Sequence, residues 1–247
     1  FQGLAVSSDS SFCKEWMNQW PTIFLTFKKV DGLNFDSAYE MLASVMADLF
    51  NEHSYLLQDE RISAYDREML ERIMNASASM TELKNSLSLM TRVMQIHYGK
   101  SVILLLDEYD VPVAKANQNG YYDEMLDLMK GLMQALKDNS ALRFAVITGC
   151  LKIAKESIFT GTNNFVSDTI VTLGLNEYFG FVQREVDQIL ADGEITDKRE
   201  LIKQWYDGYH FGDWDVYCPW DVMNYVLELQ HNPQAKPAGY WKNTSDN

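Results

Sequence analysis

The order of apolar and polar residues alternates between strand-like and helix-like patterns over the first two thirds of the chain. Three short runs rich in β-branched and aromatic residues predict strands at 21–27 (PTIFLTF), 102–106 (VILLL) and 142–147 (LRFAVI). An unbroken apolar run such as 102–106 is typical of a strand that is covered on both faces, as in a parallel sheet. Residues 168–173 (DTIVTL) predict a further strand of the same sheet.

Apolar residues at three- and four-residue spacing predict amphipathic helices between these strands. Four such helices are expected, beginning after Asn34, after Ser63, after Ser79 and near Tyr122. The helix after Ser79 opens with a capping box and is expected to run to Gly99, because glycine commonly ends a helix. The alternation of helix and strand from residue 22 to residue 173 predicts an α/β fold with a parallel sheet flanked by helices.

Beyond residue 175 the pattern changes to short helices around an aromatic-rich segment. The expected helices cover residues 182–191, 197–206 and 219–230. This change predicts two domains, an α/β core over 1–175 and a smaller helical, aromatic-rich subdomain over 176–247. The aromatic residues are Trp205, Tyr206, Tyr209, Phe211, Trp214, Tyr217, Trp220 and Tyr225. Because no lysines or arginines alternate with them, we interpret them as the core of the subdomain rather than as a surface that stacks bases.

Composition narrows the range of functions. The 247 residues carry a formal net charge of −14, which argues against a general grip on a nucleic-acid backbone. No apolar run approaches the roughly 20 residues that cross a bilayer, so no membrane partner is expected. The three cysteines are far apart and none forms a pair with metal-ligand spacing, which is typical of a protein of the reducing cytoplasm.

The most informative segment is Ser101–Asp110 (SVILLLDEYD), in which an apolar run ends in three carboxylates. Open α/β sheets bind their ligands beyond the carboxyl ends of the strands, where Asp107 and Glu108 are expected to lie. In nucleotide hydrolases of the P-loop class, a strand that ends this way is the Walker B motif. Its aspartate holds Mg²⁺ and the glutamate after it positions the attacking water. A buried strand followed by a solvated acidic turn would leave the same pattern.

A phosphate-binding loop is not found in the sequence. Gly99-Lys100-Ser101 matches the end of the signature GxxxxGK[ST], but the first glycine of that signature falls on Met94. The order of elements is also wrong, because the signature lies between a strand and a following helix, whereas this tripeptide follows a helix. No other GK[ST] string occurs in the 247 residues.

A second polar residue, Thr148, follows directly after the predicted strand 142–147. If this strand lies beside the one that ends at Asp107, the Thr148 hydroxyl could reach a γ-phosphate or the water that attacks it. A simple strand-ending Thr-Gly turn is the other reading, and the string by itself favours that one.

Several motifs in a fixed order carry a resemblance to a known family. They are LLLDEYD (104–110), GYYDEM (120–125), RFAVITGCLKIAKESIFTGTNN (143–164), NEYFGF (176–181), WYDGYHFG (205–212), YCPWDVMNYV (217–226) and YWKNTSDN (240–247). In these motifs the chain resembles the bacterial predicted AAA-ATPase-like family, whose members commonly join an ATPase-like region to a C-terminal PD-(D/E)XK nuclease-like domain. The resemblance implies a P-loop-NTPase-like sheet of the ASCE/AAA type.

The family pattern also implies which parts are missing. A segment similar to RPRRFGKT, which carries the phosphate loop, precedes the position of Phe1 in the family, and the nuclease-like domain follows the position of Asn247. The chain therefore resembles the middle part of a longer protein and lacks the phosphate loop. Phe1-Gln2-Gly3 is either native sequence or the remainder of a cleaved tag.

The resemblance also implies roles for individual residues. Asp107 matches the acid that binds Mg²⁺, Glu108 the acid that activates water, and Thr148 the polar sensor residue that contacts nucleotide. ATP and Mg²⁺ are the ligands implied for the intact protein. Asp110 either caps a turn or supports the metal site. The cations in or near family motifs are Arg143, Lys152, Lys155 and Arg184, and the sequence does not select which of them faces the γ-phosphate or a neighbouring subunit.

Three functions are compatible with these observations. The first is an ATPase-like regulatory module that binds and slowly hydrolyses ATP·Mg²⁺ in the intact protein and couples this to an attached, nuclease-like effector. The alternative is a nucleotide-insensitive scaffold that positions protein partners. A third reading makes Asp107, Glu108 and Asp110 a nuclease metal site, but the next strand offers no Asp/Glu-x-Lys.

Two structural expectations follow from the resemblance. Asp107 and Thr148 should lie on adjacent parallel strands at the same edge of the sheet, because the sensor strand separates the Walker B strand from the phosphate-loop strand. Without the phosphate-loop strand, the outer edge of 142–147 would be an unpaired apolar edge, which is an aggregation hazard. We expect it to be covered by 168–173, by a second copy of the chain, or by residues outside this sequence.

Overall fold

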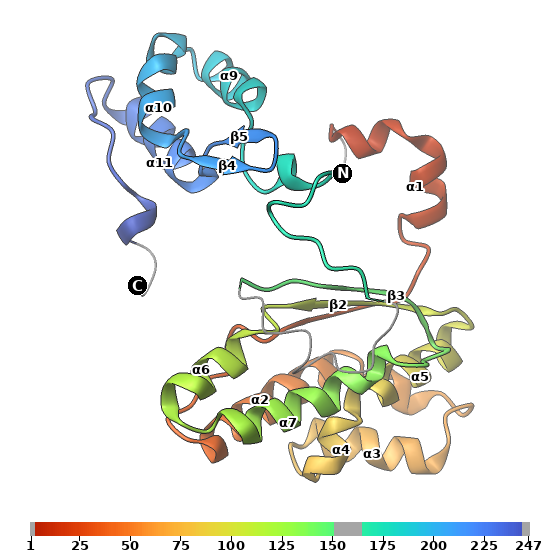
Figure 1. Cartoon of the computed structure of the whole chain (residues 1–247). Coiled ribbons are helices and arrows are strands. Elements are labelled where there is room, and N and C mark those ends of the chain that lie inside the picture. Colours follow the sequence, from red (N-terminus) through yellow and green to blue (C-terminus); the bar gives the residue numbers. More distant parts are fainter. Residues whose placement is uncertain (1–2, 151–164, 244–247) are drawn as a thin grey trace. The chain divides into compact units, whose positions relative to one another are not determined.

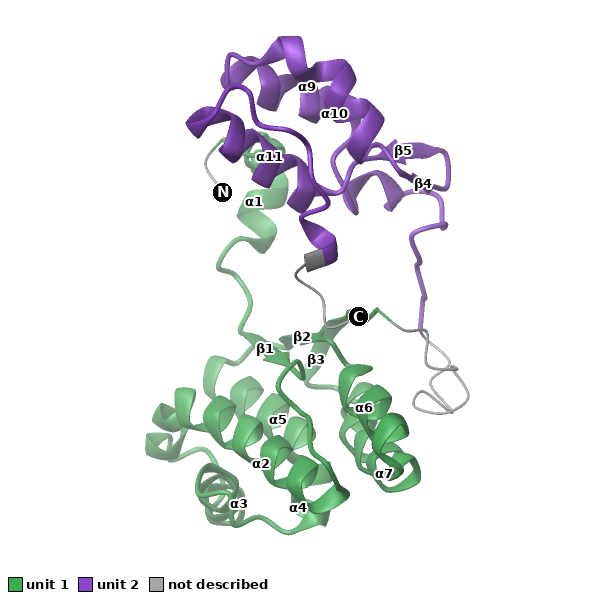
Figure 2. Cartoon of the chain, turned by 90° about the vertical axis from the view of Figure 1, so that its left-hand side faces the viewer, with its two compact units in different colours: residues 1–163 green, residues 164–247 purple. Residues whose placement is uncertain are grey.

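The computed structural model describes residues 3–150 and 165–243. The chain divides into two compact units, unit 1 with residues 1–163 and unit 2 with residues 164–247 (Figure 2). Each unit has its own buried core and is described by itself.

Unit 1 is built on a three-stranded parallel sheet. Its strands are β1 (Thr22–Thr26), β2 (Val102–Asp107) and β3 (Leu142–Ile147), in the spatial order β1-β2-β3. The prediction of an α/β fold with a parallel sheet flanked by helices is therefore confirmed. The central strand is the apolar run that ends in the acidic residues, so its hydrogen-bonding groups are paired on both sides.

The register aligns side chains in rows across the sheet. Because side chains alternate between the two faces of a strand, every second residue of β2 shares a face with its partners on β1 and β3. On the face that is turned away from the helices, the rows are Thr22–Ile103–Phe144, Phe24–Leu105–Val146 and Thr26–Asp107–Thr148.

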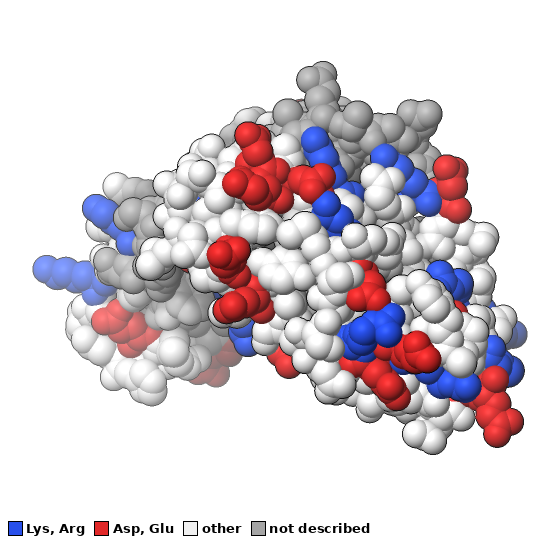
Figure 3. Space-filling model, turned by 90° about the horizontal axis from the view of Figure 1, so that it is seen from below, with Lys and Arg blue, Asp and Glu red and all other residues white. Residues whose placement is uncertain are grey.

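The helices of unit 1 that follow β1 all lie on one side of the sheet (Figure 1). They are α2 (Phe35–Glu52), α3 (Ala64–Met74), α4 (Met80–Lys84), α5 (Ser86–Tyr98), α6 (Val111–Asn119) and α7 (Tyr122–Met133). On the surface over these helices, acidic and basic side chains are interspersed (Figure 3). None of the described helices is both long enough and apolar enough to cross a membrane.

The predicted helix starts agree with the structure, with one correction. The Asn34 side chain accepts a hydrogen bond from the backbone N–H of Ser37, and Ser79 forms a capping box with Glu82. The expected single helix from Ser79 to Gly99 is wrong, because it divides at Asn85 into α4 and α5. The Asn85 amide donates to the Thr81 carbonyl at 2.8 Å, and such side-chain bonds compete with the helical backbone pattern.

The two faces of the sheet differ in their cover. Leu104 points toward the helices and is 0% exposed, whereas Phe24 and Val146, on the other face, are 58% and 45% exposed. Part of this second face is contacted by the end of helix α1 (Ser10–Trp16), where the Trp16 ring packs edge-on against Phe144 with centroids 5.8 Å apart. Among the described residues the helical face is buried along β1 and β2, whereas Ala145 and Ile147 of β3, on the same face, are partly exposed.

The prediction that 168–173 forms a further strand of the sheet is wrong. Its residues form turns in which the Thr172 N–H donates to the Thr169 carbonyl at 2.8 Å. The Thr172 hydroxyl also accepts from the Thr169 N–H at 3.0 Å. These local bonds satisfy the backbone groups that a strand would offer to a neighbour, although the threonines and valine have high strand propensity.

Unit 2 combines short helices with a hairpin. Its elements are α9 (Gln183–Asp192), α10 (Arg199–Tyr206), β4 (Tyr209–Phe211), β5 (Trp214–Val216) and α11 (Pro219–His231), with β4 and β5 antiparallel. The turn between the strands is made by Gly212, whose φ of +58° favours glycine. The buried cluster contains Tyr206, Tyr217 and Tyr225, so part of the aromatic segment forms the core. Trp205, Tyr209 and Trp220 are instead about half exposed.

The unequal cover of the sheet gives a direct prediction for two neighbouring leucines of β2. Leu104→Ala should lower the free energy of unfolding of unit 1 by about 2–5 kcal/mol, because it leaves a cavity under the helices. Leu105→Ala removes the same atoms from the partly exposed face and should cost less than half as much. Urea unfolding of both variants measures the difference. Equal costs would show that the second face is covered as completely as the first.

Candidate functional site

The last row of side chains across the sheet forms a hydrogen-bonded triad. The Thr148 hydroxyl donates to Oδ1 of Asp107 at 2.7 Å, and the Thr26 hydroxyl donates to Oδ2 at 3.1 Å. Asp107 and Thr148 therefore lie together at the carboxyl edge of adjacent parallel strands, as the sequence predicted. Each carboxylate oxygen of Asp107 is oriented by a hydroxyl from a different neighbouring strand.

Backbone hydrogen bonds continue past the strand ends and hold this triad in place. The Asp107 carbonyl accepts from the Phe27 N–H at 2.9 Å, which extends the pairing with β1. On the other side, the Thr148 N–H donates to the Leu106 carbonyl at 2.8 Å, and the Thr148 carbonyl accepts from Tyr109 at 3.2 Å. The side chain of Asp107 thus projects from a backbone that is fixed on both flanks, which is the requirement for a precisely positioned ligand.

Glu108 ends the central strand in an unusual backbone conformation. Its φ is +56°, in the left-handed region that non-glycine residues rarely adopt. The turn that follows is closed by the Val111 N–H, which donates to the Glu108 carbonyl at 3.2 Å and leads into α6. Within the described residues the Glu108 carboxylate has no hydrogen bond or ion pair, and it is partly exposed. Backbone strain of this kind persists only where the surrounding structure fixes the residue, and it is concentrated at functional sites.

Asp110 is packed against Gly149 beneath this edge. It occupies the N-cap position of α6 and is 2% exposed, but its side chain does not cap the helix. A Cβ atom at Gly149 would lie 2.5 Å from Oδ1 of Asp110 and 2.7 Å from the Tyr109 ring. The Thr148-Gly149 pair therefore needs its glycine, because the loop after β3 passes directly over the acidic turn after β2.

Three carboxylates act together on the loop after β3. Partial desolvation raises the pKa of the Cys150 thiol, and Glu108, Asp110 and Asp107 raise it further. The edge is therefore a concentration of negative charge with oxygen donors, which suits a hard cation such as Mg²⁺. In the part of the chain that the structure describes, no group of three or more histidine, cysteine or acidic side chains is arranged as metal ligands.

Of the four candidate cations, only Arg143 is described within unit 1, and it lies away from this edge. Arg143 lies at the opposite end of β3, where its guanidinium stacks over Trp16 and Trp20 at 5.7 and 5.3 Å. Arg184 belongs to unit 2, where it pairs with Glu177 at 3.0 Å. Arg143 is therefore not placed to act with Asp107. The other two candidates, Lys152 and Lys155, lie outside the described residues.

Thr26 is a member of the site that the sequence analysis did not identify. The signal was present, because Thr26 is near the end of the predicted strand 21–27, and a hydroxyl at the carboxyl end of a parallel strand faces the same edge as Asp107. The order of the strands decides its importance, because β1 pairs directly with β2.

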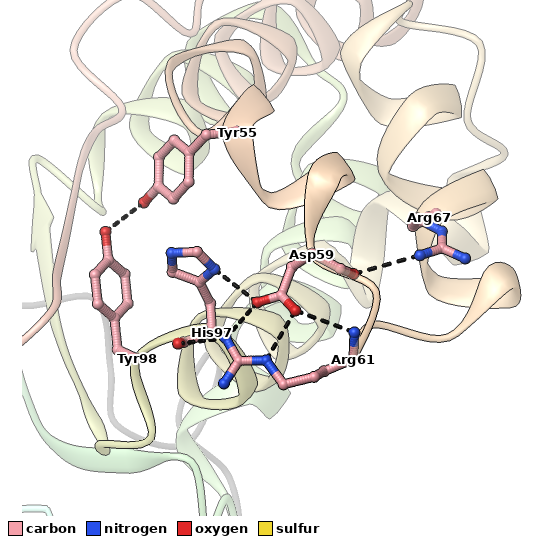
Figure 4. A network of polar contacts seen from close by, with 6 residues as sticks. All are labelled: Tyr55, Asp59, Arg61, Arg67, His97 and Tyr98. Atoms are coloured by element: carbon pink, nitrogen blue, oxygen red, sulfur yellow. Dashed lines mark hydrogen bonds and ion pairs between the residues drawn. The ribbon is translucent and has the colours of Figure 1, made fainter.

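A second polar network lies near the other end of β2, where α5 ends (Figure 4). The Arg61 guanidinium donates to both carboxylate oxygens of Asp59, at 2.8 and 2.6 Å. Nδ1 of His97 is 2.7 Å from the same carboxylate, and Arg61 also donates to the His97 carbonyl at 2.9 Å. The network holds the loop around Asp59 against the last turn of α5, so we interpret it as a structural clamp.

The charge balance of this clamp is set by arginine. The hydrogen bond from Arg61 holds the pKa of Asp59 well below its usual range, and His97 contributes a smaller lowering. The Asp59 side chain is 8% exposed, so its charge depends on these partners. Above the network, the Tyr55 and Tyr98 hydroxyls form a hydrogen bond of 2.8 Å (Figure 4).

Comparison with known proteins identifies a family and a similar protein. Residues 1–159 match the family model described as Predicted AAA-ATPase. A protein of Azotobacter chroococcum mcd 1, described as an uncharacterized protein in the vnfD 5′ region, is 30% identical over 148 residues. The aligned part is 59% of this chain but only 27% of that protein, so the chain corresponds to a minor part of its length. No solved structure matches the chain.

The backbone of Glu108 generates a testable prediction about stability. Glu108→Gly and Glu108→Ala remove the same carboxylate, but only glycine adopts the positive φ without strain. We expect the glycine variant to be more stable than the alanine variant by about 1 kcal/mol, although glycine normally destabilises a fold relative to alanine. Urea unfolding of the two variants is the measurement. An alanine variant that equals or exceeds the glycine variant in stability would contradict a left-handed Glu108.

The Asp59 clamp predicts a pH-dependent loss of stability. Because the pKa of Asp59 is lowered in the folded state, its contribution is fully present above the ordinary carboxyl pKa of about 3.9 and is lost as the pH falls through the folded value. Asp59→Asn should therefore destabilise unit 1 at pH 7, and the difference from wild type should shrink below about pH 4.

Unfolding of unit 1 can be followed from the His97 ring resonances at several pH values. Asp127→Asn is the matched control, because Asp127 is 71% exposed and forms a surface ion pair with Lys84. A difference between Asp59→Asn and wild type that is unchanged from pH 7 to pH 3 would contradict the assignment.

Proposed function

The chain belongs to the predicted AAA-ATPase family, and from this premise we propose that the edge around Asp107 is the metal and water side of an ATPase site in the intact protein. The single observation that carries the proposal is the orientation of Asp107 by hydroxyls from both neighbouring strands, at 2.7 and 3.1 Å. A solvated acidic turn, the other reading of the sequence, would not require a carboxylate that is fixed on two sides. The strand order supports the same conclusion, because it places the proposed sensor strand directly beside the strand of Asp107.

The geometry suggests a separate role for each of Asp107, Glu108 and Thr148. Asp107 would hold Mg²⁺, since it is the oriented carboxylate and its oxygens are hard donors. The bound ion would supply the positive charge that neutralises the β- and γ-phosphates of ATP. Glu108 would orient the attacking water and accept its proton, because its carboxylate is partly exposed and makes no hydrogen bond or ion pair among the described residues. The Thr148 hydroxyl, bonded to Asp107, would sense the state of the nucleotide.

The regulatory role is the finer part of the proposal. We place this module in a longer protein in which slow hydrolysis of ATP controls an attached effector, of the nuclease-like kind that the family resemblance implies. The chain spans 27% of its Azotobacter relative, which leaves room for such further segments in that protein. The phosphate-binding loop would also have to come from elsewhere, because the 247 residues contain no GxxxxGK[ST] string.

The test uses the complete gene product, on the condition that it contains a phosphate loop. Glu108→Gln should lower ATP turnover by at least about 100-fold and leave nucleotide affinity nearly unchanged, as loss of a general base does. Asp107→Ala should weaken the Mg²⁺-dependent binding of ATP itself. Phosphate release and equilibrium binding measure the two effects, with Glu124→Gln as the control, because Glu124 is an exposed carboxylate of α7.

The 247 residues alone provide a second control. They should release no measurable phosphate from ATP, since no loop clamps the β- and γ-phosphates and positioning supplies most of the catalysis. Wild type and Glu108→Gln of the complete protein with equal turnover would overturn the ATPase proposal. That result would favour the alternative, a nucleotide-insensitive scaffold.

A further inference from the structure

Unit 2 contains an aromatic pocket that plays no part in the proposed ATPase site. Its volume is about 480 Å³, which lies within the range of ligand-binding pockets. The aromatic residues that line it are Phe179, Tyr209, Phe211, Tyr217, Trp220 and Trp241. They come from separate segments of unit 2, so the pocket depends on the folded state of the unit.

The hairpin explains how one wall of the pocket forms. Tyr209 and Phe211 alternate with His210 along β4 and therefore share one face of the ribbon, on which Val216 of β5 pairs with Tyr209. The opposite face is polar, with Nδ1 of His210 at 2.7 Å from the Asp215 carboxylate. The aromatic side chains are thus sorted onto the pocket face by strand periodicity.

The other wall is held by a carboxylate next to Trp220. The backbone N–H of Trp241 donates to Oδ1 of Asp221 at 2.8 Å, which brings the segment after α11 back to the start of this helix. Trp220 precedes Asp221 in the first turn of α11, so the two tryptophans reach the same pocket.

The aromatic side chains are exposed to an unusual degree for residues that gather at one place. Phe179, Tyr209, Trp220 and Trp241 are each between 47% and 52% exposed. Contiguous exposed apolar surface of this kind marks interaction sites, and tryptophan and tyrosine dominate the binding energy of such sites. We infer from this that the pocket receives a ligand.

The charges around the pocket indicate which class of ligand it favours. Residues 164–247 contain 14 acidic and 6 basic residues, and no lysine or arginine lines the pocket. Charged groups of both signs act on Tyr217, which lines the pocket: burial, Asp207 and Asp187 raise its pKa, to about 12, whereas Arg199 lowers it. Such a pocket attracts cations and repels phosphate groups.

Other tryptophans of this chain already show the corresponding interaction. Arg184 lies over the Trp214 ring at 5.7 Å, and Arg143 and Lys100 lie over Trp20 at 5.3 and 5.8 Å. No cation lies over the Trp220 ring among the described residues. Trp220 is 47% exposed, so part of its side chain is accessible to a cation from outside the chain.

We propose that this pocket binds an arginine or lysine side chain presented by an exposed, basic segment of a partner protein. The aromatic faces attract the cationic group through their quadrupoles, and the surrounding carboxylates raise its local concentration. A nucleobase could stack on the same rings, but the acidic surroundings oppose the phosphates that accompany it. A proline-rich segment would also fit aromatic walls, but its binding would not depend on charge.

The first experiment uses the complete 247-residue chain labelled with 5-fluorotryptophan. The chain has six tryptophans, and each gives a separate fluorine resonance. The probe is a blocked peptide of alternating glycine and arginine. Its matched partner carries citrulline in place of arginine, which has nearly the same shape but no charge. The arginine peptide should shift the resonances of Trp220 and Trp241 and leave that of Trp205 unchanged, and it should bind at least about tenfold more tightly than the citrulline peptide.

The second experiment uses substitutions. Trp220→Leu keeps an apolar side chain but removes the aromatic face, and it should weaken binding of the arginine peptide by about tenfold. Trp205→Leu is the matched control, because Trp205 is also about half exposed in unit 2 but does not line the pocket. If Trp220→Leu fails to fold, the comparison of arginine with citrulline on the wild-type chain still decides.

Four results would overturn the proposal. They are equal binding of the arginine and citrulline peptides, tighter binding of a neutral proline-rich peptide, tighter binding of oligothymidine, and no shift of the Trp220 resonance with any probe. The outcome is independent of ATP turnover, because the site around Asp107 is not involved.

Discussion

The hydrogen-bonded register between β2 and its two parallel neighbours is the constraint on which the candidate site depends. It places Thr26, Asp107 and Thr148 in one row, so that both oxygens of one carboxylate meet a hydroxyl. A slip of one residue would turn Asp107 toward the helices and bury its charge among apolar side chains. The register of β2 therefore determines both the geometry of the edge and which face of the strand is buried.

This register is stabilised by the buried core rather than by the residues of the site. Ile23 and Leu25 of β1, with Leu104 and Leu106 of β2, are almost fully buried under the helices. Because side chains alternate along each strand, Thr26, Asp107 and Thr148 then lie on the opposite face. The positive φ of Glu108 ends the strand at this point and turns the chain into α6. The stability of the helical face thus supports a strained acidic turn that contributes little to the core itself.

The sequence predicted the parts of this arrangement that arise from strong local patterns. The apolar run before Asp107 and the capping residues of the helices are such patterns. The position of Thr148 beside Asp107 was instead an expectation from the family resemblance, and the hydrogen bond between the two side chains agrees with it. The segment 168–173 has strand-like composition, but its threonines bond to their own backbone, a choice that composition does not reveal. Helix α6 has no clear apolar stripe, and its start depends on the turn after Glu108. The importance of Thr26 arises only from strand order, which is a tertiary property.

The most direct test of the central claim is to locate bound nucleotide relative to the row of threonines. In the complete gene product, the methyl resonances of Thr22, Thr26 and Thr148 can be observed while Mn²⁺·ATP replaces Mg²⁺·ATP. Thr22 lies on the same face of β1 as Thr26 but about 13 Å away along the strand. We expect strong paramagnetic broadening at Thr26 and Thr148 and much weaker broadening at Thr22. Equal broadening of all three, or none at Thr26 and Thr148 while ATP is bound, would contradict it.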